Sequence, residues 1–114
     1  MLKDDGIRLH HILDASRKAV EFSQGRSRND LNADSMLSLA LVRLLEVIGE
    51  AARALSEECC TAHPDIPWKK MRGMRDRLVH GYFDVNLDVV WETITKDLPP
   101  LIVVIERLIS QKDT

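Results

Sequence analysis

Residues 68–84 contain most of the side chains in this sequence that could carry out chemistry. Five of the chain's sixteen Lys and Arg residues lie there, together with His80, one of four histidines, and Tyr82, the only tyrosine. Arginine binds phosphate oxygens through paired N–H groups, and histidine gains or loses a proton near neutral pH. The segment therefore predicts a site that binds phosphates or acts on them.

Arg75 and His80 suit the cleavage of RNA, because RNA supplies its own nucleophile. The 2′-hydroxyl of a ribose attacks the neighbouring phosphate once its proton is removed. A histidine that takes this proton, or protonates the leaving oxygen, contributes typically about 10²–10⁴-fold in rate. An arginine stabilises the extra charge of the transition state. Cys59 and Cys60 are sequence neighbours without the spacing of a metal site, so we expect neither metal nor cofactor.

The same residues also allow plainer interpretations. With ten arginines and four histidines in 114 positions, chance alone gives about a third of an R-x4-H match. A basic helical face is also often merely solvated. Two alternatives to a nuclease therefore stay open. One is a non-catalytic subunit that binds nucleotide or presents a substrate to a partner enzyme, and the other is an assembly dimer whose motif is inactive.

Length and composition set the frame for this site. A chain of 114 residues, 45% hydrophobic and 30% charged, fits one helical domain over residues 1–114. Its net charge of -2 excludes a general basic field, so any contact with nucleic acid needs a local patch. We find no signal peptide and no apolar run long enough to span a membrane. The sequence predicts a soluble, cytoplasmic protein.

Hydrophobic periodicity predicts an all-α, antiparallel bundle of four to five helices with short connections. Pro99 and Pro100 cannot donate backbone hydrogen bonds, so we expect a break near Asp97 in the last helix. Gly49 lies within the second long helix, where it costs about 1 kcal/mol relative to alanine. A close helix approach would explain it. The predicted helices cover residues 4–22, 34–60, 67–80 and 87–110, with a short helical turn before residue 34.

The predicted helix 67–80 would present two faces. Met71, Met74 and Leu78 would face the core. A second, charged face carries an acidic residue one turn before the histidine, where its carboxylate could fix the histidine tautomer. That face comprises Lys69, Arg72, Asp76 and His80.

Arg75 lies about 140° around such a helix from His80, so the two side chains would not share a face within one copy. The two side chains would meet if the helix loosened at Gly81, or if a dimer placed two copies of the segment face to face, which is the interpretation we prefer. We therefore expect a composite site in a homodimer. The remaining basic residues are expected either to bind the RNA backbone or only to keep the dimer soluble. They are Lys69, Lys70, Arg72 and Arg77. Glu50 of the preceding helix is a candidate polar partner for this segment.

The segment from Gly73 to Asp84 closely resembles the signature of HEPN domains. It is most similar to the HepT branch, whose R-x4-H-x-Y motif corresponds here to Arg75, His80 and Tyr82. Residues 48–52 and 65–68 also resemble that branch, so the resemblance covers most of the chain.

The resemblance implies a dimeric all-α bundle that acts as a metal-independent ribonuclease toxin. Its antitoxin would be an MntA-type minimal nucleotidyltransferase that inactivates the toxin by transferring AMP to the motif tyrosine. Carried over, Arg75 and His80 would be catalytic and Tyr82 would be modified. The branch often has Asn where this chain has Asp76. A carboxylate there would favour protonated His80 and so assist a general acid more than a general base.

Overall fold

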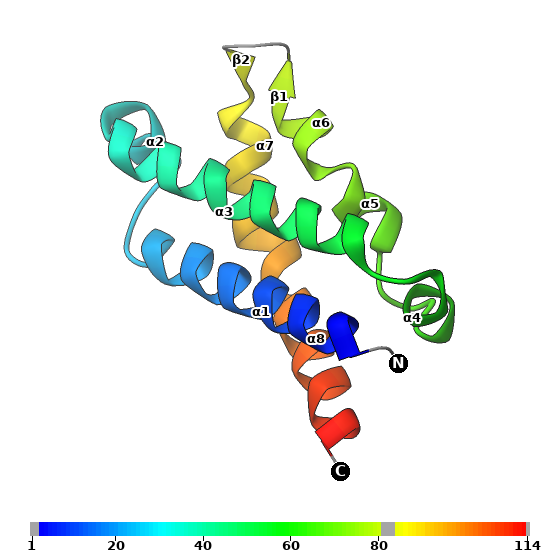
Figure 1. Ribbon diagram of the computed structural model, residues 1–114. Coiled ribbons are helices and arrows are strands. Elements are labelled where there is room, and N and C mark those ends of the chain that lie inside the picture. The colour runs from blue at the N-terminus through cyan, green and yellow to red at the C-terminus, as the bar shows by residue number, and fades with distance from the viewer. Residues whose placement is uncertain (1–2, 81–83, 114) are drawn as a thin grey trace.

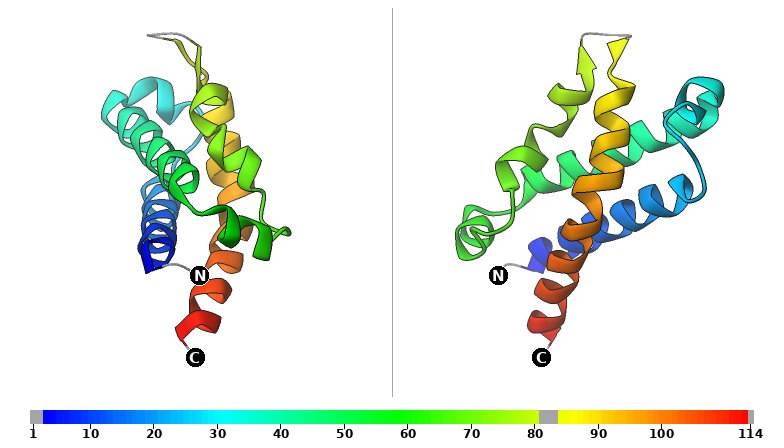
Figure 2. Two further views of the ribbon diagram at one scale, coloured as in Figure 1. Left: turned by 45° about the vertical axis from the view of Figure 1, so that its right-hand side comes forward. Right: turned by 180° about the vertical axis from the view of Figure 1, so that it is seen from behind.

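The computed structural model describes residues 3–80 and 84–113, with only the backbone described for Lys3, Val79, His80, Lys112 and Asp113. Two long helices, α1 (Lys3–Ser23) and α3 (Ser35–Ala54), lie side by side and run in opposite directions (Figure 1). A third column, formed by α7 (Leu87–Glu92), η1 (Thr93–Asp97) and α8 (Leu98–Asp113), crosses both of them (Figure 2). The predicted all-α bundle is confirmed.

Short elements connect these three layers. Helix α2 (Asp30–Ala33) precedes α3, and α4 (Glu57–Ala62), α5 (Trp68–Arg72) and α6 (Met74–Leu78) follow it. Two strands of two residues each, β1 (Val79–His80) and β2 (Asp84–Val85), pair in antiparallel fashion before α7. Of the described helices, none is long and apolar enough to cross a membrane.

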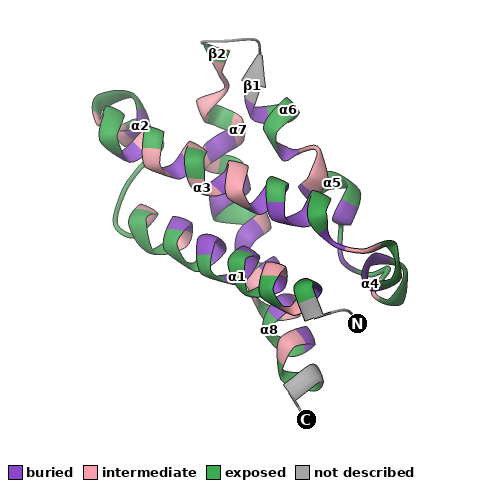
Figure 3. Cartoon of the chain, viewed as in Figure 1, coloured by how far each residue is buried: buried purple, intermediate pink, exposed green. Residues whose placement is uncertain are grey.

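The core lies where α1, α3 and the α7–α8 column meet, and Figure 3 shows the buried residues along the inward faces of these helices. In α3 the leucines that face the core are Leu37, Leu41 and Leu45, while Leu44 is only partly buried. The column and α1 contribute the other large side chains. Those fully buried from these elements are Leu9, Ile12, Val90, Ile94, Leu98 and Ile105.

The second long helix is shorter than predicted. Asp34 caps its start, and the Asp34 carboxylate accepts a hydrogen bond from Leu37 N at 3.1 Å. The predicted continuation to Cys60 is wrong, because the backbone turns extended at Leu55. Ser56 then caps α4 by accepting from Cys59 N at 3.1 Å. Buried Asp5 of α1 accepts hydrogen bonds from both the N–H and the hydroxyl of Ser56, at 2.9 and 2.6 Å. These bonds fix the connection between α3 and α4 against α1.

The segment predicted as one helix over residues 67–80 is also divided. Gly73 separates α5 from α6, and α6 ends at Leu78. His80 then pairs with Asp84 in the two-stranded ladder, and Asn86 N donates to Leu78 O at 2.7 Å. The helical prediction for Val79 and His80 is therefore wrong, since their backbone is extended and pairs with Val85 and Asp84.

The last helix is not broken near Asp97, and its backbone continues there through a π-helical turn. Thr93–Asp97 form η1, in which Leu98 N donates to the carbonyl of Thr93, five residues back. In a regular α-helix the nitrogens of Pro99 and Pro100 would donate to residues 95 and 96, but proline has no N–H. A widened turn just before such positions is one way in which a helix accommodates them. Asn86 caps α7, with its side chain accepting a hydrogen bond from Val89 N at 3.2 Å.

Candidate functional site

Helix α3 supports the segment that carries the predicted site. A Cβ placed on Gly49 would lie only 3.2 Å from Met71 O and 3.7 Å from Met74 Cβ. The close helix approach expected at Gly49 is thus confirmed. Met71, Met74 and Leu78 are buried, which confirms the predicted core face of α5 and α6. The charged residues between them are consequently held at the surface.

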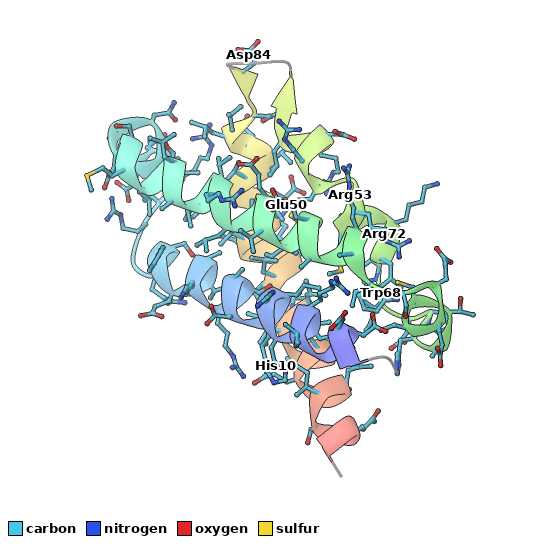
Figure 4. The ribbon with its side chains drawn as sticks, in the orientation of Figure 1. His10, Glu50, Arg53, Trp68, Arg72 and Asp84 are labelled. Carbon is cyan, nitrogen blue, oxygen red and sulfur yellow. The ribbon has the colours of Figure 1, made fainter. Side chains whose placement is uncertain are left out.

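Arg72 is engaged by protein atoms on all sides of its guanidinium. Its Nε donates to Ala52 O at 3.2 Å and its Nη2 donates to Cys60 Sγ at 2.9 Å, while Nη1 lies 3.8 Å from a carboxylate oxygen of Glu57. Arg53 in turn donates through Nε to Arg72 O at 2.8 Å, and Figure 4 shows the two arginines side by side. These contacts favour a structural role for Arg72, joining α3, α4 and α5.

Cys60 completes this junction as a buried thiol. Burial raises the pKa of Cys60, and the positive charge of Arg72 opposes that shift only in part. The sulfur is therefore held as a neutral thiol that accepts from Arg72. Sequence inspection did not identify this role, because a cysteine that accepts from arginine leaves no spacing signature.

Arg75 points its charge towards solvent while remaining paired with α3. Its side chain is 63% exposed, and its Nε lies 3.5 Å from Glu46 Oε2. The Glu46 side chain is only 24% exposed. Glu50, expected as the acidic partner of the basic segment, instead pairs with Arg43 at 3.2 Å along its own helix. The acidic partner is Glu46, one helical turn earlier.

Asp76 pairs with Arg53, whose Nη2 lies 3.6 Å from Asp76 Oδ2. The prediction that Asp76 and His80 occupy adjacent turns of one helix is wrong, since α6 ends at Leu78. Asp76 is thereby assigned to the contact between α6 and α3.

The other basic residues divide into paired and unpaired groups. Lys70 lies 3.0 Å from Asp97 of η1. Lys69 and Arg77 are exposed, and neither forms an ion pair with the residues whose side chains are described. Free cations at the surface suit contact with a polyanion.

The R-x4-H-x-Y motif is placed in part. Arg75 stands on α6, and the backbone of His80 follows directly in β1, paired with Asp84 at the far end of the bundle (Figures 1 and 4). The two residues therefore lie at the same end of the molecule. Tyr82 falls outside the residues that the structure describes, and so do the predictions about its surroundings.

Known proteins resemble this chain over most of its length. The model of a family described as "Ribonuclease HepT-like" matches residues 12–108. A protein of Caldanaerobacter subterraneus named as a candidate RNase is 45% identical over 93 residues, which are 82% of this chain and 83% of that protein. A protein of Thermococcus cleftensis named as a probable ribonuclease HepT is 38% identical over 93 residues, covering 82% and 84% of the two chains.

A third relative is a candidate RNase of Methanocaldococcus jannaschii. It is 34% identical over 108 residues, covering 95% of this chain and 89% of its own. No solved structure gives a significant match.

Proposed function

The chain belongs to the HepT-like ribonuclease family, and from that premise we propose that it cleaves RNA without a metal ion as the toxin of a toxin–antitoxin pair. Arg75 and His80 are the proposed catalytic residues. The proposed antitoxin is a minimal nucleotidyltransferase that silences the enzyme by AMPylation of Tyr82.

The proposed reaction is an intramolecular transesterification. The 2′-oxygen of the substrate attacks the adjacent phosphorus, and the bond from phosphorus to the 5′-oxygen breaks. The 2′-hydroxyl loses its proton and the departing 5′-oxygen gains one, which leaves a 2′,3′-cyclic phosphate and a 5′-hydroxyl. His80 carries out a proton transfer in this scheme, and Arg75 stabilises the charge on the phosphoryl oxygens.

The observation that carries this proposal is the exposed guanidinium of Arg75 directly before the strand that contains His80. Glu46 contacts Nε of Arg75, so the edge formed by its two Nη atoms remains open for a phosphate. Lys69 of α5 and Arg77 of α6 are exposed, with no ion pair to the side chains that the structure describes, and they are the proposed contacts for the RNA backbone. Arg72 and Asp76 act as supporting residues, since their contacts hold α5 and α6 against α3.

In the proposed regulation, the Tyr82 hydroxyl attacks the α-phosphate of ATP bound to the antitoxin. The tyrosine then carries AMP, and pyrophosphate and the phenolic proton leave. An anionic adduct two residues after His80 would occupy the position of RNA and repel its phosphates. Mass spectrometry of the Tyr82 peptide after co-expression with the nucleotidyltransferase tests this step, and an unmodified tyrosine in an inactive complex would contradict it.

A homodimer is the proposed active form, and the outer face of α3 is the surface that best fits it. Met36 and Leu39 on this face are 82% and 70% exposed, which is unusual for large apolar side chains at adjacent turns. Two α3 helices that meet in antiparallel fashion about a two-fold axis near Leu39 would cover these apolar side chains against each other. The end of α3 that carries Met36 and Leu39 is therefore the proposed dimer contact.

The dimer is tested by analytical ultracentrifugation of Leu39→Glu. We expect this variant to sediment as a monomer and to lose RNA cleavage, because a charge is placed on the apolar face. Val103→Glu is the matched control, since Val103 is an exposed apolar residue of α8. A dimeric, active Leu39→Glu protein would show that another surface is used.

The nuclease proposal is tested with purified protein and structured RNA in the presence of EDTA. We expect cleavage that ends in cyclic phosphates, and we expect His80→Ala to abolish it while the circular dichroism spectrum stays that of a helical protein. Wild-type protein that leaves RNA intact under all conditions would refute the enzymatic function. It would leave the non-catalytic subunit as the better interpretation.

A further inference from the structure

Glu46 is placed to control the direction of the Arg75 guanidinium. We propose that Glu46 is a positioning residue for RNA cleavage, which it assists by holding Arg75 from the Nε side. This inference rests on the proposed nuclease function. The contact joins Nε of Arg75 to Oε2 of Glu46 at 3.5 Å, an ion pair longer than a typical hydrogen bond. It connects α6, which carries the motif arginine, to α3, the helix that supports it.

The difference in exposure between the two side chains indicates which one is fixed. Glu46 is 24% exposed on a long helix, whereas Arg75 is 63% exposed on a helix of five residues. A carboxylate partly covered by its surroundings has few positions available. The more exposed arginine side chain therefore takes its orientation from the glutamate.

A contribution to folding stability does not explain why Glu46 and Arg75 are paired. Ion pairs with a largely exposed partner contribute little to folding. The α3–α6 contact is already maintained by the buried side chains of Met74 and Leu78 and by the close approach at Gly49. The direction of the guanidinium is the property that Glu46 adds.

A guanidinium has two edges that can bind a planar or tetrahedral anion. One edge is formed by Nε and one Nη, and the other by both Nη atoms. Because Glu46 lies at the Nε side, the edge of the two Nη atoms remains for the phosphate. An arginine held in this manner before RNA binds loses less rotational freedom in the transition state.

The charge of Glu46 could also act against RNA cleavage by repelling the phosphates. The experiment separates this repulsion from the proposed positioning role. A carboxylate beside a phosphate site weakens the binding of RNA by charge repulsion. If repulsion were its main effect, Glu46→Gln would bind RNA more tightly and cleave it at least as fast. If Glu46 positions Arg75, Glu46→Gln should cleave bound RNA more slowly than the wild type and should bind nucleic acid no more weakly.

The test measures single-turnover cleavage of RNA and, separately, the affinity for a DNA strand of the same sequence, which lacks the 2′-hydroxyl. We expect Glu46→Gln to lower the cleavage rate about 10- to 100-fold while DNA affinity is unchanged or higher. Glu46→Asp, which keeps the charge on a shorter side chain, should recover part of the rate. Glu106→Gln is the matched control, because Glu106 forms a Glu–Arg pair with Arg17 between two other helices.

A second readout is independent of activity. The Nε–H signal of Arg75 in a ¹⁵N NMR spectrum, assigned by its loss in Arg75→Lys, should shift and exchange faster in Glu46→Gln but not in Glu106→Gln. An unchanged signal overturns the proposed orientation even if the wild type is inactive. If the wild type cleaves RNA and Glu46→Gln cleaves it equally well, only the positioning role fails. If the wild type does not cleave RNA at all, the proposed function fails, and the NMR result alone decides the orientation.

Discussion

Gly49 of α3 lies against the main chain of Met71, so closely that a Cβ on the glycine would be 3.2 Å from the Met71 carbonyl oxygen. This approach sets how near the motif segment stands to α3. It also places Arg75 within reach of Glu46 and Asp76 within reach of Arg53. The glycine thereby fixes the position of the candidate catalytic arginine from the opposite side of the interface.

Replacing Gly49 by leucine should destabilise the protein by about 1–3 kcal/mol, because the added side chain overpacks the contact with Met71. Leucine favours helices, so a loss would not come from helix propensity. Urea unfolding measures the change. Ala54→Leu, at the exposed end of the same helix, is the control. Equal stability of both variants would show that the α3–α5 contact can accommodate a leucine side chain at position 49.

Arg72 should behave as a structural residue in spite of its place in a basic segment. Arg72→Lys keeps the charge but loses the fork that reaches Ala52 O and Cys60 Sγ. We expect a loss of about 1–3 kcal/mol of stability from the unsatisfied buried groups, measured by urea unfolding. The salt dependence of RNA binding should stay unchanged.

Lys69→Ala provides the comparison for Arg72. Because Lys69 is exposed, its replacement should not change the urea midpoint of unfolding. It should reduce the salt dependence of RNA binding, since a phosphate contact is lost. If Arg72→Lys reduced the salt slope and left stability intact, Arg72 would be an RNA contact as first expected.

Periodic patterns predicted the helices well. The apolar repeat that indicates the helix around Gly49, and the prolines that interrupt the regular pattern of the last helix, both act within one or two turns. The family motif likewise identified the chain's relatives. Information of this kind is local, so a single sequence displays it.

The errors arose where distant segments decide the local backbone. The helix over 34–60 ends early because Ser56 binds buried Asp5, which lies 51 positions away in the chain. Val79 and His80 leave the helix because Val85 and Asp84 offer them a strand partner. Glu46 was overlooked as a site residue for the same reason, since only the folded contact between α3 and α6 places it beside Arg75.

Acid should weaken the start of α3 through Asp34. Hydrogen bonding from Leu37 N, followed by the interaction with Arg26, holds the pKa of Asp34 below the ordinary aspartate value. A carboxyl with a lowered folded pKa stabilises the protein above its unfolded pKa, and the contribution is lost as the pH falls through the folded pKa. The melting temperature of wild type should therefore fall as the pH drops below about 4.

The contribution of Asp34 is isolated with Asp34→Asn. Asparagine also caps helices, so this variant should keep the helix at neutral pH and show a shallower loss of melting temperature in acid. Arg26→Gln should show a smaller change in the same direction, because the cap hydrogen bond is the larger cause of the shift. Identical acid profiles for Asp34→Asn and wild type would contradict the assignment.

Arg75 and Arg77 stand two residues apart on the same short helix, both exposed, and only Arg75 is proposed to contact the reacting phosphate. Arg75→Ala should lower the single-turnover cleavage rate about 10²–10³-fold, as expected when a donor to transition-state charge is removed. Arg75→Lys should fall between this variant and wild type, since lysine supplies charge without a paired N–H edge. Arg77→Ala should instead weaken RNA binding and lower the salt slope by about 0.7 for one lost phosphate contact. If both alanine variants changed affinity alike and left the rate of bound RNA untouched, Arg75 would be an electrostatic contact and the catalytic group would have to be sought elsewhere in the motif.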